Sequence, residues 1–123
     1  MSHNITITAG PVELNAELND TAAARAIWDS LPISASGNTW GDEIYFRIPV
    51  DAEANDLKEV VDFGDLAYWP PGSAFCIFFG PTPASRGDEI RPASPVAVVG
   101  RIIDDAAQFR QVSAGTRVTI ARA

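Results

Sequence analysis

The strongest constraint on the fold is a short apolar run in the middle of the chain, FCIFF at residues 75–79. Its aromatic content predicts a strand, in which Phe75, Ile77 and Phe79 face one way and the two residues between them face the other. Both faces are therefore apolar, so neither can lie open to water. A barrel interior on one side, and a helix, a loop or a partner subunit on the other, would cover such a strand.

Alternation of apolar and polar residues predicts most of the other elements as strands. The clearest case is VELNAEL at residues 12–18, which a Gly10-Pro11 turn joins to a strand over 5–8. The polar stretch 34–42 is expected to be a loop, as is the proline-rich stretch 81–95. Further strands are expected at residues 43–48, 60–63, 66–69, 96–103 and 116–121.

Two short helices are expected between these strands. Asp20 is a good helix N-cap, an alanine-rich stretch with apolar residues at helical spacing follows it, and Pro32 ends it. The second helix would begin after Asp104. With seven or eight strands and no βαβ rhythm, residues 1–123 are expected to form a single, mainly β domain. We expect a mostly antiparallel closed barrel with two short helices.

Charge and hydropathy argue against two classes of partner. The net charge is −7, and no cluster of lysine and arginine is present to neutralise phosphate, so nucleic acid and anionic membrane surfaces are not expected partners. The longest apolar run falls short of the ~20 residues of a membrane-spanning helix. The opening residues show no basic stretch followed by an apolar one, so a cytoplasmic location is expected.

The cysteine and histidine counts argue against several kinds of chemistry. Cys76 is the single cysteine, and His3 is the single histidine and lies in an N-terminus expected to fray. A disulfide, a Ser-His-Asp triad, a Cys-His dyad and a multi-histidine metal site are therefore not expected within one chain. No metal or cofactor is expected. Cys76 itself, between two apolar neighbours, is expected to be inert core.

Four segments carry a resemblance to a known family. They are NTWGDEIYF (38–46), GDLAYWPPG (64–72), FFGPTP (78–83) and IRPASPVAVVG (90–100), and together they span most of the chain in order. The chain resembles the small cyclophilin-like proteins of bacteria and archaea, a family without a settled activity. The resemblance implies a closed, roughly eight-stranded barrel with a helix at each end.

The resemblance also raises the question of prolyl isomerase activity. True cyclophilins carry a strand of the form FHRIIPxF, whose arginine assists the twisting amide, and YFRIP places Arg47 in a partial match to it. Ala74 stands where those enzymes have a glutamine, and the pocket histidine has no counterpart. A conventional isomerase is therefore not expected. A degenerate one, with Arg47 as its catalytic residue, remains an alternative.

The favoured interpretation is a binding pocket with an aromatic rim. Segments 38–47, 68–79 and 81–95 would form it, and a small molecule or a short peptide would be the ligand. A structural protein whose apolar faces pack on a second copy, giving a homo-oligomer, is the other alternative. The candidate ligand-binding residues are Trp40, Glu43, Tyr45, Arg47, Tyr68, Trp69, Phe78, Thr82 and Arg91.

Several of these residues also have a purely structural interpretation. Trp40 could be a lid that only packs, and Arg47 could form a surface ion pair. The aromatic residues before Pro70-Pro71 could close one end of the barrel by stacking on the proline rings, and the sequence leaves open whether Trp69-Pro70 or Pro70-Pro71 is cis. Glu43 stands out among the acidic residues because it shares a strand face with Tyr45 and Arg47.

Overall fold

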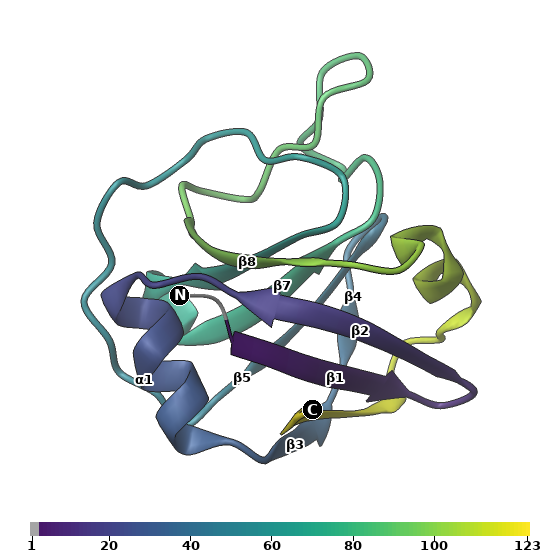
Figure 1. The fold of residues 1–123 in the computed structure, drawn as a ribbon. Helices are drawn as coiled ribbons and strands as arrows, with labels where there is room; N and C mark the ends of the chain where they lie inside the picture. Colours follow the sequence, from purple (N-terminus) through teal and green to yellow (C-terminus); the bar gives the residue numbers. More distant parts are fainter. Residues whose placement is uncertain (1–2) are drawn as a thin grey trace.

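The computed structural model describes residues 3–123 and shows an antiparallel sheet of nine strands that curls into a nearly closed barrel (Figure 1). The sheet order is β3-β9-β1-β2-β8-β6-β7-β5-β4. The expectation of a mainly β barrel is confirmed. The strands are β1 (His3–Ala9), β2 (Val12–Leu18), β3 (Ile33–Ser36), β4 (Asn38–Thr39), β5 (Glu43–Arg47), β6 (Asp65–Trp69), β7 (Ala74–Phe78), β8 (Ala97–Ile102) and β9 (Arg117–Arg122).

Three short helices accompany the sheet. The α-helix α1 (Ala22–Ser30) lies at one end of the barrel, and the 3-10 helix η2 (Ala106–Gln111) lies at the other (Figure 1). The double proline forms a single 3-10 turn, η1 (Pro70–Gly72). The cis peptide bond described is Leu31–Pro32 rather than either bond at Pro70 or Pro71. None of the helices in residues 3–123 is long and apolar enough to cross a membrane.

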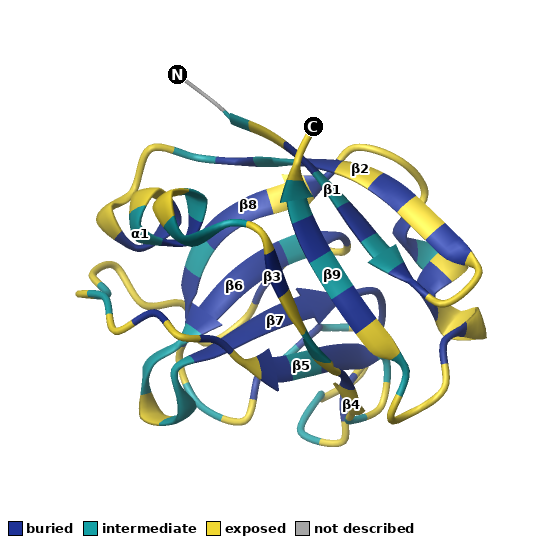
Figure 2. Cartoon of the chain, turned by 90° about the horizontal axis from the view of Figure 1, so that it is seen from below, coloured by how far each residue is buried: buried dark blue, intermediate teal, exposed yellow. Residues whose placement is uncertain are grey.

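The N-terminal hairpin forms as its alternation predicts. In β1 and β2, Ile7 pairs with Leu14, and Gly10 adopts a φ of +58° in the turn between them. The apolar side chains of both strands are buried and the polar ones are half-buried or exposed, which Figure 2 shows as alternating colours. The expectation that His3 lies in a frayed terminus is wrong. His3 begins β1, and its ring lies 4.4 Å from that of Trp28.

The two edge strands of the sheet are consecutive in the chain and meet at Gly37. This residue donates its N–H to the Thr116 carbonyl at 2.8 Å, and a Cβ here would lie 3.0 Å from Val118 and 3.1 Å from Ile44. A side chain at this position would crowd Val118 of β9 and Ile44 of β5. The prediction of a loop over 34–42 is wrong at β3 and β4. Their exposed serine, asparagine and threonine side chains do not show the apolar alternation by which a strand is recognised.

Both expected helix caps are displaced by one residue. Thr21, rather than Asp20, caps α1, because its hydroxyl accepts the Ala24 N–H at 3.2 Å. Asp105, rather than Asp104, caps η2. The Asp104 carboxylate instead accepts the backbone N–H of Asn15 at 2.7 Å and so ties β2 to the start of this helix.

The barrel interior is filled by apolar side chains. Phe46 and Phe75 contact each other from adjacent strands with ring centroids 5.7 Å apart, and Phe109 of η2 closes one end. Tyr68 also points inward, where its hydroxyl donates to the Val50 carbonyl at 2.7 Å. No room is therefore expected for a ligand inside the barrel.

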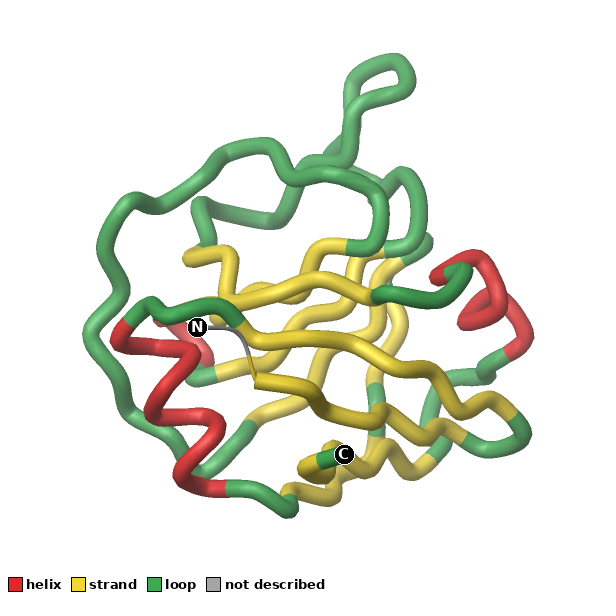
Figure 3. The backbone as a smooth tube through the Cα atoms, viewed as in Figure 1, coloured by secondary structure: helices red, strands yellow, loops and turns green. Residues whose placement is uncertain are grey.

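Two long segments cover the outer face of β5, β7, β6 and β8, apart from the start of the first, where Ile48 and Val50 belong to the inner core. They are the connecting segment (residues 48–64) and the covering loop (residues 79–96), both drawn as loop on the same side of the barrel in Figure 3. Lys58 and Val96 exchange two backbone hydrogen bonds, and Val61 donates to Ile90 at 2.9 Å. The strand expected at 60–63 is wrong, since only the bridge at Val61 forms. The second apolar face of β7 is therefore covered by the chain's own loops.

Candidate functional site

A second, smaller apolar cluster lies on the outer face of the sheet. In the register of the three central strands, Tyr45 of β5 pairs with Cys76 of β7, which also pairs with Ala67 of β6. Because alternate residues share a face, Glu43 and Trp69 lie on this outer face too. Its members are Val61, Ala67, Ala74, Cys76, Phe78, Ile90 and Val96, with Tyr45, Trp69 and Val98 packed against them.

A pocket of about 260 Å³ lies between this outer face and the covering loop. Strands β5, β6 and β7 provide its floor and part of its wall, and the β4–β5 turn and the covering loop provide the rest. Its lining is mostly aromatic and aliphatic, with a single carboxylic acid. The residues that line it are Trp40, Glu43, Tyr45, Trp69, Cys76, Pro92, Ala93 and Val96.

The Trp69 indole is held in place from two sides. Its Nε1–H donates to the Ser94 hydroxyl of the covering loop at 2.7 Å. Gly72 lies against its ring, since a Cβ at that position would be 2.7 Å from Cζ3. The turn after β6 and the covering loop therefore fix one aromatic wall of the pocket.

Trp40 is positioned by a tight turn between β4 and β5. Its N–H donates to the Glu43 carbonyl at 3.0 Å, and Gly41 adopts a φ of +61° within the turn. A Cβ on Gly41 would lie 2.9 Å from the Pro81 carbonyl oxygen, so the turn packs directly on the covering loop. The Asp42 N–H donates to that same carbonyl at 2.9 Å. The β4–β5 turn and the covering loop therefore jointly position Trp40 at the pocket.

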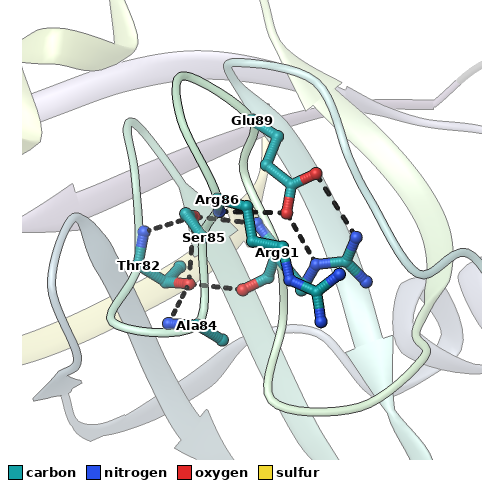
Figure 4. Close-up of polar contacts among 6 residues, drawn as sticks. All are labelled: Thr82, Ala84, Ser85, Arg86, Glu89 and Arg91. Atoms are coloured by element: carbon teal, nitrogen blue, oxygen red, sulfur yellow. Dashed lines mark hydrogen bonds and ion pairs between the residues drawn. The ribbon is translucent and has the colours of Figure 1, made fainter.

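The covering loop is stabilised by hydrogen bonds among its own residues (Figure 4). The buried Thr82 hydroxyl donates to the Arg91 carbonyl and accepts the Ala84 N–H at 3.2 Å. The Ser85 hydroxyl accepts the backbone N–H groups of Thr82 and Arg91 at 2.9 and 3.1 Å. The Arg91 side chain pairs with Glu89 at 2.6 Å. These contacts fold the loop back on itself and bring Pro92 and Ala93 to the pocket.

Glu43 is the buried acid of the site. Only 5 % of the residue is exposed, and burial raises the pKa of its carboxyl from 4.5 to about 7, an effect partly offset by a hydrogen bond with the Cys76 thiol. Burial, followed by the nearby Glu43 carboxyl, raises the pKa of that thiol well above its usual range. The carboxyl can therefore gain or lose a proton near neutral pH, while the thiol stays protonated.

The arrangement offers aromatic surfaces, one ionisable carboxyl and a thiol that burial keeps protonated. The lining contains no serine, histidine, lysine or arginine. Within residues 3–123, no three histidine, cysteine or acidic side chains are placed to hold a metal ion. Such a lining suits recognition of a ligand with an apolar body and one polar group.

The structure brings four of the nine candidate residues together, namely Trp40, Glu43, Tyr45 and Trp69. The other five lie elsewhere. Arg47 is exposed near the end of the same face of β5, opposite Ala74, and does not line the pocket. Tyr68 faces the barrel interior, Phe78 is fully buried in the outer cluster, and Thr82 and Arg91 serve the hydrogen bonds of the covering loop.

Four lining residues are not among the candidates named from the sequence, although the first three lie in the segments 68–79 and 81–95 expected to form the pocket: Cys76, Pro92, Ala93 and Val96. Cys76 is buried as expected, yet it forms part of the pocket floor beside Glu43. Alternation along β7 places it on the outer face, but only the β5–β7 register places it opposite Tyr45. Pro92 and Ala93 lie in the segment 81–95 expected at the pocket, but only the path of the loop decides which of its residues line it.

Comparisons with known proteins agree with this architecture. A family model described as cyclophilin-like matches residues 3–121. The chain is similar to a hypothetical protein from Archaeoglobus fulgidus, whose solution structure superimposes with a TM-score of 0.84 at 42 % sequence identity, covering 99 % of this chain and 95 % of that one. No curated protein matches the chain.

Proposed function

The chain belongs to the cyclophilin-like family, and from that premise we propose that it is a binding protein. The pocket between the outer face of the sheet and the covering loop would take a small molecule or one side chain of a short peptide. The observation that carries this proposal is the pocket itself, about 260 Å³ in volume, with Trp40, Tyr45 and Trp69 in its lining. A cytoplasmic location accompanies the proposal as an expectation.

The position of the pocket supports a binding role. The barrel interior is filled, whereas the outer face is incompletely covered although two long segments cross it. Large aromatic side chains that line open space, with one polar group among them, are typical of ligand sites. The proposal requires no second copy of the chain, because the chain's own loops cover the rest of this face.

The three tryptophans allow a direct test by NMR. Trp40 and Trp69 line the pocket, whereas Trp28 belongs to α1 and contacts His3 and Arg122. A library of small fragments and X-Pro dipeptides is added to the 15N-labelled protein, and the three indole N–H signals are followed after assignment with Trp→Phe variants. A binder should shift the signals of Trp40 and Trp69 and leave that of Trp28 in place.

Two results would contradict the proposal. One is a library in which no compound moves either pocket indole. The other is equal movement of all three indoles, which would indicate nonspecific association. A true binder should also raise the midpoint of thermal unfolding, because a ligand that binds only the folded state stabilises it by about 2.7 kcal/mol at one hundred times its Kd.

The isomerase alternative is tested separately, with X-Pro peptides and an Arg47→Ala variant. The binding proposal expects no rate above the uncatalysed one, since Arg47 is exposed and outside the pocket. Catalysis that disappears in the variant would overturn that expectation and assign Arg47 a catalytic role.

A further inference from the structure

We propose that the ligand of this pocket carries an ammonium group, held against the aromatic side chains and paired with the Glu43 carboxylate. This inference rests on the binding function proposed above and names the chemistry of the ligand. It stands on three observations: the aromatic lining, the buried acid, and the lack of a basic side chain in the lining.

The aromatic lining provides surfaces that attract a cation. Trp40, Tyr45 and Trp69 reach the pocket from three different parts of the chain, the turn before β5, β5 itself and β6. The negative face of an aromatic ring attracts ammonium groups, and tryptophan does so most strongly. Aromatic residues gathered around one pocket are the means by which proteins bind alkylated ammonium ions.

Trp28, which lies outside the pocket, already has a cation partner within the chain. The Arg122 guanidinium lies 4.4 Å from the centroid of the Trp28 ring, and this is the only cation–π contact within residues 3–123. Trp40 and Trp69 have no such internal partner in the described structure. Their rings are therefore available to a cation that comes with the ligand.

Glu43 provides the charge that an ammonium ion needs in a buried place. A buried carboxylate is stable only when it is paired or hydrogen-bonded, and no arginine, lysine or histidine lines the pocket. Of the nearby charged groups, Asp42 pairs with Arg110 at 3.5 Å and Arg91 with Glu89 at 2.6 Å, and Arg47 lies at the exposed end of β5, outside the lining. Glu43 has the Cys76 thiol as a hydrogen-bond partner but no opposite charge in the lining, and a ligand cation would supply that charge.

Protonation of Glu43 makes this binding depend on pH. Burial brings its pKa to about 7, so the free carboxyl is largely protonated below neutrality and a cation must displace that proton. The other titratable groups in the lining are the Tyr45 phenol on β5 and the Cys76 thiol on β7. Strand β6 and the covering loop contribute no titratable side chain to the lining.

Choline and its neutral carbon isostere, 3,3-dimethylbutan-1-ol, form the decisive pair of probes. They have the same shape, and neither titrates, so any pH dependence belongs to the protein. Affinities are taken from titrations of the Trp40 and Trp69 indole N–H signals, with Trp28 as the internal control. We expect choline to bind at least about tenfold more tightly at pH 8, a difference that one ion pair or a cation–π contact readily supplies. We expect its affinity to fall by at least about tenfold on going to pH 5.5, as Glu43 takes up its proton.

Two matched variants locate the effect. Glu43→Gln keeps the shape of the side chain and should weaken choline binding by about tenfold or more and abolish its pH dependence, while leaving the isostere unaffected. Glu13→Gln makes the same change at an exposed position of β2 and should alter neither. Circular dichroism checks that both variants are folded.

The outcomes separate this inference from the proposal it rests on. Equal affinity for choline and the isostere at the pocket indoles would uphold a binding pocket and overturn the ammonium ligand. Failure of choline to move either indole would overturn the ammonium ligand as well, and the fragment library would then decide the binding function by itself. A third probe, Nα-acetyl-trimethyllysine methylamide, identifies the source: tighter binding than choline indicates a peptide side chain, and weaker binding indicates a free small ammonium compound.

Discussion

The two faces of the central strands differ in how completely they are packed. On β7, Phe75 and Ile77 point into a filled barrel, where the polar atom of Tyr68 is hydrogen-bonded to Val50. Cys76, between them, points to the outer face, where a buried acid and a pocket of about 260 Å³ lie beneath the covering loop. In β7, the residues that face inward therefore contribute to stability, and the alternate residues, which face outward, contribute to the pocket. Changes to the inner face should therefore affect stability, and changes to the outer face should affect the pocket.

The largest expected effect comes from neighbouring residues on β7. Phe75→Ala removes a fully buried ring that packs on Phe46 and should lower the free energy of unfolding by about 3–5 kcal/mol. Cys76→Ala should cost only about 1 kcal/mol, since it enlarges a space that already exists. Chemical denaturation measures both. Equal losses would mean that the outer face is packed as tightly as the inner one.

A large effect is also expected from the ionisation of Glu43. Its pKa is raised in the folded protein, so the folded state binds the extra proton between pH 4.5 and about 7, and stability falls as pH rises through that window. The difference from 4.5 corresponds to roughly 3 kcal/mol above pH 7. Glu43→Gln should remove this loss and be more stable than the wild type at pH 8, with little difference at pH 4.

Denaturant unfolding across this pH range checks the prediction, and Glu13→Gln serves as the control because that residue is exposed. Other groups titrate as well, so the quantity of interest is the difference between the wild-type and variant curves. Parallel curves for the wild type and Glu43→Gln would show that the outer face does not bury this acid.

A smaller loss of stability is expected from removing the Tyr68 hydroxyl, on the inner face of β6. Tyr68→Phe leaves the Val50 carbonyl without its donor and removes the acceptor of the Ala52 N–H. Loss of a buried hydrogen bond of this kind costs about 1–3 kcal/mol. Thermal and denaturant unfolding should show the loss, while ligand binding at the outer pocket should be unchanged. Weakened binding would show that the two faces are coupled.

The smallest effect on stability is expected in the covering loop. Thr82→Val removes the hydroxyl that joins Arg91 and Ala84 and should reduce the free energy of unfolding by about 1 kcal/mol. Hydrogen exchange should quicken at the Ala84 amide, and the pocket indoles should shift although no lining residue has changed. Thr39→Val, at an exposed position, is the control. Unchanged exchange in the loop would mean that Thr82 does not organise it.

The sequence predicts most of the fold because alternation is a local property. The period of apolar side chains predicts the hairpin over residues 5–18 and the strand at 75–79 with two apolar faces. It also predicts the barrel, because that strand needs cover on both faces. The failures occur where short polar side chains hide a strand, as in β3 and β4, and at caps where two adjacent residues compete, as at Asp20 and Thr21. For β3 and β4, pairing with β9 and β5 decides the structure.

The site is less predictable than the fold for a physical reason. The sequence by itself determined that β7 must be covered on both faces and that Glu43 and Tyr45 share one face, because alternation is set within a single strand. Only the tertiary structure decided that Cys76 lies opposite Tyr45, that Tyr68 turns inward, and that Pro92 closes the pocket. Strand register and loop path depend on contacts between residues far apart in the chain, which no local pattern records.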